Sequence, residues 1–326
     1  MNDSALPVID LSLLDGGPES AAQFRDDLLR ATHDVGFFYL VGHGVDETLM
    51  DDLLAASREF FALSEEQKFA VENVKSPQFR GYTRVGGELT EGKTDWREQI
   101  DVGPERPVVD NAAGLADYWR LEGPNQWPDA VPQLRDLVNE WNDKLSAVSL
   151  RLLRAWAQAL GAPEDVFDHA FAEKPFPQLK IVRYPGESNP EPKQGVGAHR
   201  DGGVLTLLWV DVPPKPGAFV VNIGEMLELA TEGYLKATLH RVISPLIGDD
   251  RISIPFFFNP ALDTVMPQLQ LPPELAAQAR GLSLDPTNSP ILETYGDNAL
   301  RYRMRAHPNV AQIHHDDLIQ GPRGAI

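Results

Sequence analysis

His199 and Asp201, in the segment GAHRDGGVLTLLWV (197–210), are the first residues whose types and spacing suggest chemistry. Side chains two positions apart lie on the same face of a strand, so an imidazole and a carboxylate could bind one divalent ion there. His314 and Asp316 have the same spacing, but they lie in a polar stretch near the C-terminus with no predicted strand behind it. We expect that second pair to belong to a solvated tail, and spacing alone therefore does not establish a metal site.

Residues farther along the chain strengthen the case for the first pair. His240, in YLKATLHRVISP, supplies a third potential ligand in an alternating apolar segment. RISIPFFFN then places Arg251 and Ser253 two positions apart, where a guanidinium and a hydroxyl can together hold a carboxylate. Two histidines, one carboxylate and an Arg-x-Ser pair predict an iron site with open coordination positions beside a pocket for an acidic co-substrate.

Each of these residues also has an ordinary structural interpretation. His240 could be a core histidine that is hydrogen-bonded to the backbone. Arg251 has three alternative acidic partners, namely Asp249, Asp250 and Glu228. The metal-site prediction rests on all of these residues occurring together in this order.

Composition narrows the class of protein. The chain of 326 residues contains no cysteine, so a metal would have to use His, Asp or Glu ligands. Its net charge of −19 argues against binding to nucleic acid phosphates. We find neither a signal peptide nor an apolar run long enough to span a membrane, and we expect a cytoplasmic protein.

Helical and strand patterns divide the chain into two parts. Apolar spacing predicts helices at 18–34, at 46–71 with an interruption near Ser64, and at 131–160. Predicted strands are 6–11, 37–41, 96–102, 178–184, 203–210, 217–223, 234–244 and 251–259. We expect a mainly β protein with flanking helices (α+β). Residues 1–173 would be helix-rich, and residues 174–326 mostly a β sandwich or barrel with a C-terminal helical or extended segment.

At this point the chain resembles the isopenicillin N synthase-like branch of the Fe(II)/2-oxoglutarate-dependent oxygenases. Motifs that match the family occur in family order along nearly the whole chain: LPVIDLS (6–12), DVGFFYLVGHGV (34–45), FRGYTR (79–84), GPNQWPD (123–129), KIVRYPG (180–186), AHRDGGVLTLL (198–208), PGAFVVNIGEML (216–227), KATLHRVI (236–243) and RISIPFFFNP (251–260). The resemblance implies a double-stranded β-helix (jelly-roll) core within a single oxygenase domain spanning 1–326.

The resemblance also implies roles for individual residues. His199, Asp201 and His240 would be the iron ligands. Arg251, Ser253 and Tyr184 would hold 2-oxoglutarate or a substrate carboxylate. Arg80 would contact substrate in the place where some family members use an arginine, and we add Phe258 as an aromatic candidate for the pocket wall. The substrate would be a small, carboxylate-bearing molecule, and the protein a monomer or weak homo-oligomer.

The expected reaction is oxidation of an unactivated C–H bond by O2 (hydroxylation, desaturation or cyclisation), with 2-oxoglutarate converted to succinate and CO2. One alternative is an Fe(II) oxidase of the isopenicillin N synthase type, which needs no 2-oxoglutarate because Arg251 and Ser253 hold a substrate carboxylate instead. Another is a ligand-binding protein with a vestigial iron site. Succinate formation separates the first alternative from the expected reaction.

The sequence departs from the family pattern between Leu208 and Val210. Family members have room for an extra hairpin here, whereas LTLL runs directly into WVDVPPKPG in this chain. Either the hairpin is deleted or a mobile loop has been omitted from the numbering. We favour omission, because a deletion would leave unpaired strand edges and a half-open iron site.

Overall fold

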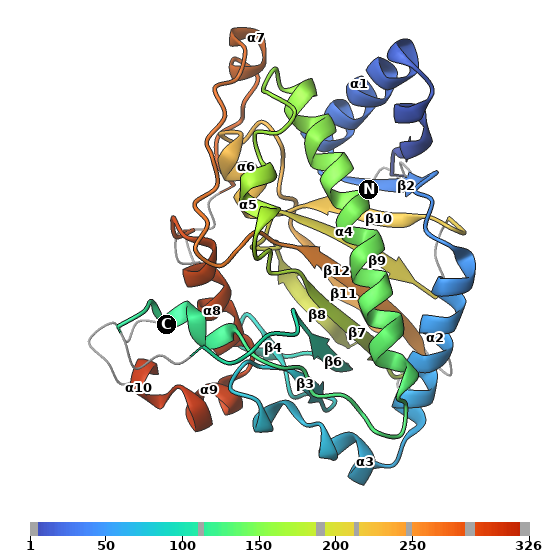
Figure 1. Cartoon of the computed structure of the whole chain (residues 1–326), viewed down its shortest axis with the longest axis vertical. Helices are drawn as coiled ribbons and strands as arrows, with labels where there is room; N and C mark the ends of the chain where they lie inside the picture. Colours follow the sequence, from blue (N-terminus) through green and yellow to red (C-terminus); the bar gives the residue numbers. More distant parts are fainter. Residues whose placement is uncertain are drawn as a thin grey trace.

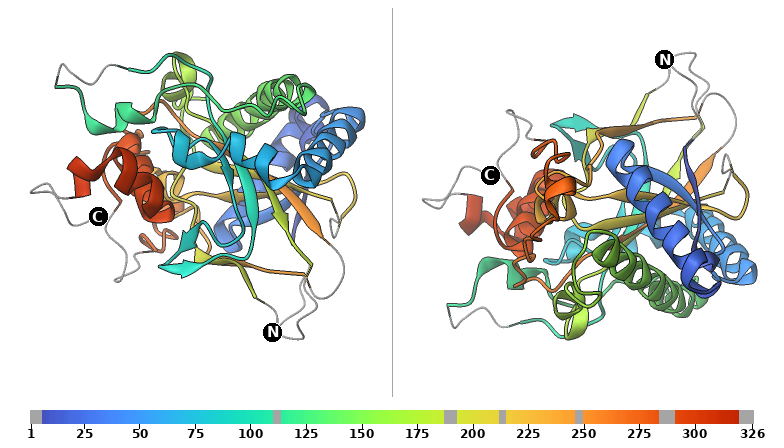
Figure 2. Two further views of the ribbon diagram at one scale, coloured as in Figure 1. Left: turned by 90° about the horizontal axis from the view of Figure 1, so that it is seen from below. Right: turned by 90° about the horizontal axis from the view of Figure 1, so that it is seen from above.

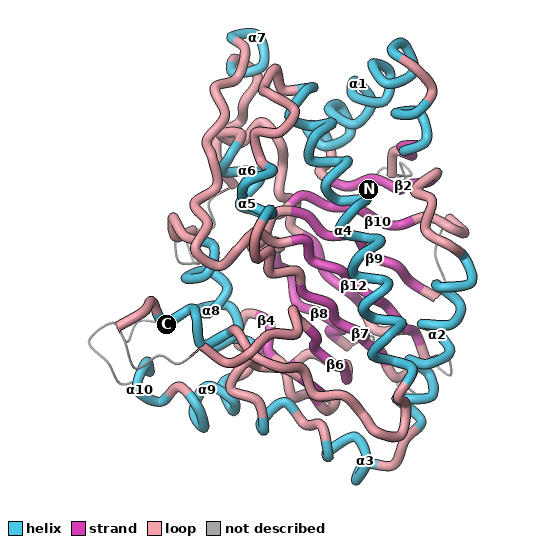
Figure 3. The backbone as a smooth tube through the Cα atoms, viewed as in Figure 1, coloured by secondary structure: helices cyan, strands magenta, loops and turns pink. Residues whose placement is uncertain are grey.

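The computed structural model describes residues 6–109, 114–186, 193–211, 215–245, 250–283 and 291–319. The strands lie at the centre and the helices surround them (Figures 1 and 3). The main sheet has the order β1-β2-β10-β9-β12-β7-β6-β3, in which only the β1–β2 pair is parallel. A second, two-stranded sheet pairs β11 with β8, and β4 pairs with β5.

The strands are short, and most lie where alternating or continuous apolar residues predict them. Their bounds are β1 Val8–Asp10, β2 Phe37–Val41, β3 Gly81–Thr83, β4 Leu89–Thr90, β5 Lys93–Thr94, β6 Glu98–Val102, β7 Gln178–Tyr184, β8 Gln194–His199, β9 Leu205–Val210, β10 Phe219–Ile223, β11 His240–Ile243 and β12 Arg251–Phe258. The sequence patterns missed β3, β4, β5 and β8, and they extended β11 too far toward the N-terminus. The expectation of a mainly β core with flanking helices is confirmed.

The helices are α1 Pro18–Asp34, α2 Glu47–Ala62, α3 Glu65–Ala70, α4 Gln133–Ala159, α5 Asp168–Ala172, α6 Glu225–Ala230, α7 Pro273–Ala276, α8 Tyr295–Ala306, α9 Pro308–His314 and α10 Asp316–Ile319. Short 3-10 helices occupy Leu11–Asp15, Asn73–Lys75 and Asp117–Leu121. The predicted interruption at Ser64 is real. The Ser64 hydroxyl accepts from the Gln67 backbone and the Gln67 side chain accepts from the Ser64 backbone, which starts α3 as a separate helix.

Helix α4 braces the main sheet. Leu134, Val138, Trp141, Leu145 and Trp156 recur along one helix face and are fully buried, and α4 contacts β9 and β12 as well as α1 and α2. Figure 2 shows that α8 to α10 lie at the end of the molecule away from α2. Helix α4 thus covers one face of the main sheet, whereas His199 and His240 lie on β8 and β11 of the second, two-stranded sheet.

The full sequence runs directly from Leu208 to Trp209, so the omitted-loop interpretation was wrong, and the segment is a continuous part of β9. Leu208 pairs with Val220 of β10, Trp209 with Ile254 of β12 and Val210 with Ser253. The chain itself lacks the hairpin, and the unpaired strand edge that we expected from a deletion is present. Among the described residues β11 has a strand partner only on its β8 side.

The exposed edge of β11 carries apolar side chains. Leu239 and Ile243 are 51% and 50% exposed. Such an edge is tolerated here because β11 is short and because the exposed Arg241 lies between these two residues. Among the helices that the structure describes, none has both the length and the apolar character needed to cross a bilayer.

Candidate active site

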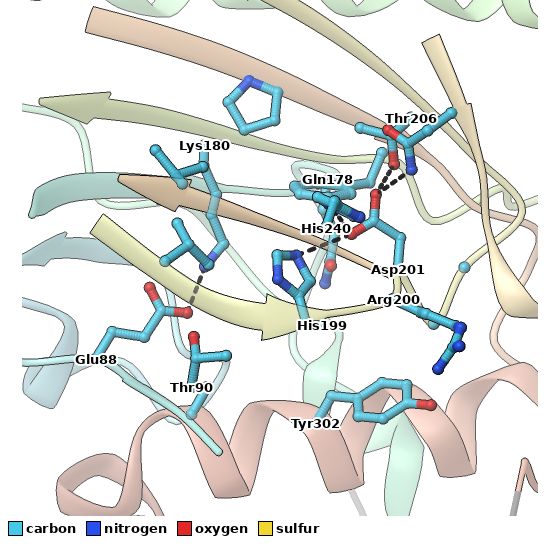
Figure 4. A pocket seen from close by; sticks show the side chains of 18 of the residues that line it. Glu88, Thr90, Gln178, Lys180, His199, Arg200, Asp201, Thr206, His240 and Tyr302 are labelled. Carbon is cyan, nitrogen blue, oxygen red and sulfur yellow. Dashed lines mark hydrogen bonds and ion pairs between the residues drawn. The ribbon is translucent and has the colours of Figure 1, made fainter. Parts of the chain in front are cut away.

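Three side chains converge where β8 ends and β11 begins. His199 is the last residue of β8, it pairs directly with His240 at the start of β11, and Asp201 lies in the turn just after β8. One potential ligand atom from each residue lies within 4.8 Å of the other two. The Asp201 Oδ1 atom is 3.3 Å from His199 Nε2 and 3.8 Å from His240 Nε2 (Figure 4). The strand-face argument for His199 and Asp201 was wrong in detail, because the turn and not the strand brings the carboxylate into place.

Both imidazoles are oriented by backbone carbonyls. His199 Nδ1 lies 2.8 Å from the Gly197 carbonyl oxygen, and His240 Nδ1 lies 3.0 Å from that of Thr238. A carbonyl oxygen can only accept, so Nδ1 carries the proton in each ring and Nε2 keeps its lone pair for a metal. Phe37 packs edge-on against the His240 ring with centroids 5.1 Å apart. A core histidine that is only hydrogen-bonded to the backbone would not explain why the Nε2 atom of His240 faces Asp201.

Asp201 is held with one oxygen facing the imidazoles. Its Oδ2 atom accepts hydrogen bonds from Thr206 Oγ1 at 2.5 Å and from Asn222 Nδ2 at 2.8 Å, which leaves Oδ1 for a metal. Burial alone would raise the pKa of this carboxyl, but His199, His240 and Asn222 hold it well below its usual range. The carboxylate is therefore charged and correctly oriented before a metal arrives.

The two hydrogen-bond donors to Asp201 support the first of our predictions. We expect Thr206→Val and Asn222→Leu each to lower Fe(II) affinity by roughly 10- to 100-fold, as is typical when a partner of a metal ligand is removed. Anaerobic Fe(II) titration measures the effect. Thr231→Val is the control, because the Thr231 hydroxyl donates only to helix α6 carbonyls. Unchanged iron affinity in both site variants would contradict the prediction.

His199 and His240 differ in how readily a proton competes with a metal for the imidazole. Burial lowers the pKa of His240. Burial also opposes the charged form of His199, but its hydrogen bond and charge interaction with Asp201 raise its pKa above the ordinary value. A proton and a metal cannot occupy the same nitrogen of His199. Acidification therefore weakens metal binding, and His199 is protonated before His240.

A cavity of about 640 Å³ runs from this cluster along the sheet. Arg251, Ser253 and Tyr184 line it together with the three convergent residues. Arg251 pairs with Tyr184 across the β12–β7 ladder, and Ser253 pairs with Val210. The structure thus brings together the predicted ligands and the predicted carboxylate anchor in one cavity.

The Arg251 side chain has no hydrogen bond or ion pair with any described residue. Two of its alternative partners are engaged elsewhere. Asp250 bonds Arg183 and the Gly186 amide, while Glu228 bonds the Ala237 amide and Ser283. The third, Asp249, lies outside the described residues. A cation that faces a cavity without a carboxylate partner is suited to bind an anionic ligand.

Arg80 and Phe258 lie away from the cavity. Arg80 is 1% exposed, packs over the Phe176 ring and donates to the Leu121 carbonyl. Phe258 is buried and stacks on Phe171 with centroids 4.3 Å apart. Both side chains lie in the packed interior, so we assign neither a substrate contact.

The expectation of a solvated tail at His314 and Asp316 was wrong. His314 ends α9 and its Nε2 lies 2.8 Å from the Val74 carbonyl oxygen, while the adjacent His315 is 1% exposed and stacks on Phe79. Among the described residues, only His199, Asp201 and His240 form a group of three or more potential metal ligands. The second His-x-Asp pair is structural.

One wall of the cavity contains a buried charge network that the sequence did not indicate. Glu88 lies 2.6 Å from Lys180 and 2.9 Å from Arg97, and Arg303 lies 2.6 Å from Asp101. Lys180 also approaches Asp101 at 3.6 Å. Arg97 also lies 3.2 Å from Asp95, so three acids and three bases neutralise one another and this wall is polar without a large net charge.

His307 sits inside this network and leads to a prediction about acid stability. Burial lowers its pKa to about 4, although Glu88 and Asp101 act in the opposite direction. Because the folded state resists a proton that the unfolded chain accepts near pH 6.5, stability falls as the pH drops from about 6.5 to 4. The full loss from this group is about 3 kcal/mol.

Chemical denaturation at several pH values tests this expectation. His307→Gln should flatten the stability curve between pH 6.5 and 4, whereas the exposed His169→Gln should leave its slope unchanged. An identical slope in the wild type and His307→Gln would show that other groups cause the acid sensitivity.

Comparison with known proteins gives a consistent result. The family model described as non-haem dioxygenase in morphine synthesis N-terminal matches residues 6–130, and the 2OG-Fe(II) oxygenase superfamily model matches residues 175–260. The chain is 33% identical to the 2-oxoglutarate-dependent dioxygenase frbJ of Dothideomycetidae sp., over 96% of this chain and 92% of that protein. It is also 33% identical to homoarginine-6-hydroxylase 2-ODD-C23.1 of Arabidopsis thaliana, over 82% of this chain and 88% of that protein.

The chain is also similar to a solved structure described as JOX2 in complex with 2OG, Fe and JA. The TM-score is 0.69 and the sequence identity is 28%, over 95% of this chain and 89% of that one. The alignment with frbJ has 343 positions, which exceeds the 326 residues of this chain. The relative therefore has residues that this chain lacks, as expected if a hairpin is deleted here.

Proposed function

The chain belongs to the 2OG-Fe(II) oxygenase superfamily, and from that premise we propose that His199, Asp201 and His240 bind the iron and that Arg251, Ser253 and Tyr184 bind 2-oxoglutarate. The enzyme is a non-haem, Fe(II)- and 2-oxoglutarate-dependent dioxygenase that uses O2. The observation that carries the residue assignment is geometric. Three metal-binding atoms converge at one point of a cavity that Arg251 also lines from β12 of the main sheet, and Arg251 has no ion pair with a described residue.

The donor set fits the metal. Two imidazole nitrogens and one carboxylate oxygen on one side of an ion leave coordination positions open, which is the arrangement typical of non-haem Fe(II) oxygenases. Fe(II), when bound, supplies the positions for 2-oxoglutarate and O2 and the oxidising chemistry. Thr206 and Asn222 fix the carboxylate, and the carbonyls of Gly197 and Thr238 fix the two rings.

The protein side of the reaction is positioning and neutralisation. The Arg251 guanidinium would neutralise the distal carboxylate of 2-oxoglutarate, and the Ser253 hydroxyl would donate to it from the same strand face. Aromatic and aliphatic residues of the cavity, among them Phe37, Leu208 and Val242, limit the access of water to the reacting groups. The relatives favour this use of the arginine over the oxidase alternative.

We further propose that the substrate is a small, carboxylate-bearing molecule and that residues 1–326 act as one oxygenase domain, as a monomer or weak homo-oligomer in the cytoplasm. Homoarginine, which names one of the relatives, is itself a carboxylate-bearing substrate. The edge of β11 that the missing hairpin leaves unpaired belongs to the cavity wall, since His240 and Val242 line the cavity.

Anaerobic addition of Fe(II) and then 2-oxoglutarate tests the assignment. We expect a visible metal-to-ligand charge-transfer band, followed by slow succinate formation when O2 is admitted. Bound iron with no band, together with O2 uptake that does not depend on 2-oxoglutarate, would overturn the proposal in favour of an oxidase.

A further inference from the structure

The cavity has a second end, opposite the 2-oxoglutarate anchor. Arg251 lies at one end of β12, whereas Phe257, near the other end, pairs with Thr206, the residue that bonds Asp201. Six residue steps along β12 place these points roughly 20 Å apart. Beyond Asp201, its carbonyl accepts from the Glu225 amide at 2.7 Å where α6 begins. If Arg251 holds 2-oxoglutarate, the end near Glu225 is left for the molecule that is oxidised.

Glu225 presents a half-satisfied carboxylate to this end. Its Oε2 atom accepts from the Tyr302 hydroxyl at 3.1 Å, while Oε1 has no hydrogen bond with any described residue. Both residues line the cavity. Burial raises the pKa of Tyr302 to about 12, so this hydroxyl stays protonated and acts as the donor. One carboxylate oxygen therefore remains as an acceptor for a ligand.

Arg200 presents unused donors to the same end (Figure 4). Its Nε atom donates to the Ala237 carbonyl at 2.9 Å, which fixes the side chain, and its two terminal nitrogens have no partner among the described residues. Arg200 and Glu225 do not form a direct ion pair with each other. Burial raises the pKa of Glu225, and the charge of Arg200 acts in the opposite direction. Two opposite charges thus face one cavity without neutralising each other.

We propose that Arg200, Glu225 and Tyr302 recognise the head group of an α-amino acid. The terminal nitrogens of Arg200 donate to the carboxylate, and Glu225 Oε1 accepts from the ammonium group. A ligand with only one of these charges would leave the other protein charge desolvated and unpaired, which is costly. The buried charges of the cavity wall do not alter this balance, because Glu88 pairs with Arg97 and Lys180, and Arg303 pairs with Asp101.

The substrate class rests on the proposed dioxygenase function. In a hydroxylation, one oxygen atom of O2 enters a C–H bond in the side group of the amino acid and the other enters succinate, as 2-oxoglutarate loses CO2. Recognition through the head group leaves the side group free to extend toward the iron ligands. Specificity among amino acids would then depend on the length and polarity of that group.

A screen of free amino acids with the iron-loaded enzyme tests the inference. We expect at least one L-amino acid with a long side group to raise succinate formation above the slow uncoupled rate and to bind under anaerobic conditions by calorimetry. Its N-acetyl derivative and its methyl ester should each bind at least 10-fold more weakly, since each removes one charge. Equal binding of the parent and both derivatives would overturn the proposal.

Variants separate recognition from folding and from iron chemistry. Glu225→Gln and Arg200→Met should each weaken amino-acid binding by roughly 30-fold or more, while the charge-transfer band and the KM for 2-oxoglutarate stay unchanged. Glu232→Gln is the matched control, because this acid at the other end of α6 faces solvent and bonds only Gln268. Loss of the band in wild-type protein would defeat the dioxygenase assignment. A normal band without any amino-acid response would defeat the substrate class alone.

Discussion

Asp201→Asn is expected to abolish tight Fe(II) binding and to reduce 2-oxoglutarate-dependent turnover more than any other single substitution in the protein. The change removes the one anionic ligand while it keeps the shape of the side chain. Loss of a residue that only orients a ligand typically costs 10–100-fold in metal affinity, so loss of the ligand itself should cost more than roughly 100-fold. Anaerobic titration of Fe(II) and single-turnover succinate formation are the measurements.

Thermal unfolding gives a second readout of the same substitution. At a hundred times its dissociation constant, a bound metal stabilises the folded state by about 2.7 kcal/mol. Fe(II) should therefore stabilise the wild type and not the variant. The metal-free variant should be less stable than the metal-free wild type, because His199, His240 and Asn222 favour the charged carboxylate of Asp201 in the folded state. The comparison that tests metal binding is therefore the shift that Fe(II) causes in each protein.

Asp316→Asn is the control, since Asp316 has the same spacing from His314 as Asp201 has from His199. We expect iron affinity and turnover of this control to match the wild type. Iron affinity that survived Asp201→Asn and failed in Asp316→Asn would show that the wrong His-x-Asp pair had been chosen.

The sequence predicted the metal site because two histidines, one aspartate and an Arg-x-Ser pair rarely occur together in this order. The structure brings His199, Asp201 and His240 together as the sequence predicted, but the predicted local geometry was wrong, because β8 ends at His199 and the turn that follows directs Asp201. It could not find Thr206 and Asn222, since threonine and asparagine in strands carry no chemical signal until the fold shows which atom they bond.

Tertiary packing explains the other differences. Arg80 lies in the motif where some family members use an arginine to contact substrate. In the structure its side chain is buried against Phe176 and lies near a second basic residue, Arg303. Tyr302 was missed because it lies on a C-terminal helix far along the chain from the other site residues, and only the folded structure brings α8 against the cavity. The missing hairpin was recognised from the sequence. Its cause was misjudged, because the energetic cost of an open edge is small for a strand as short as β11.

Arg251→Met is expected to weaken 2-oxoglutarate binding by roughly 30-fold or more, because truncating one partner of a buried, hydrogen-bonded charge pair costs about 2–5 kcal/mol. The effect should appear in the KM for 2-oxoglutarate and in its dissociation constant from the charge-transfer band. The rate at saturating 2-oxoglutarate should change much less, because the distal carboxylate is held equally in the ground state and the transition state. Ser253→Ala should cost only about 1 kcal/mol, since it removes one neutral donor.

Two comparisons decide whether the arginine acts on the co-substrate. Arg183 lies on β7 opposite Ile252, so its side chain points to the other face of the sheet, where it bonds Asp250 and Glu98. Arg183→Met should lower stability and leave 2-oxoglutarate affinity unchanged. If Arg251→Met instead weakened binding of the oxidised substrate and left the dissociation constant of 2-oxoglutarate intact, the anchor would serve the substrate. The oxidised substrate would then be assigned to the Arg251 end of the cavity, and 2-oxoglutarate to the Glu225 end.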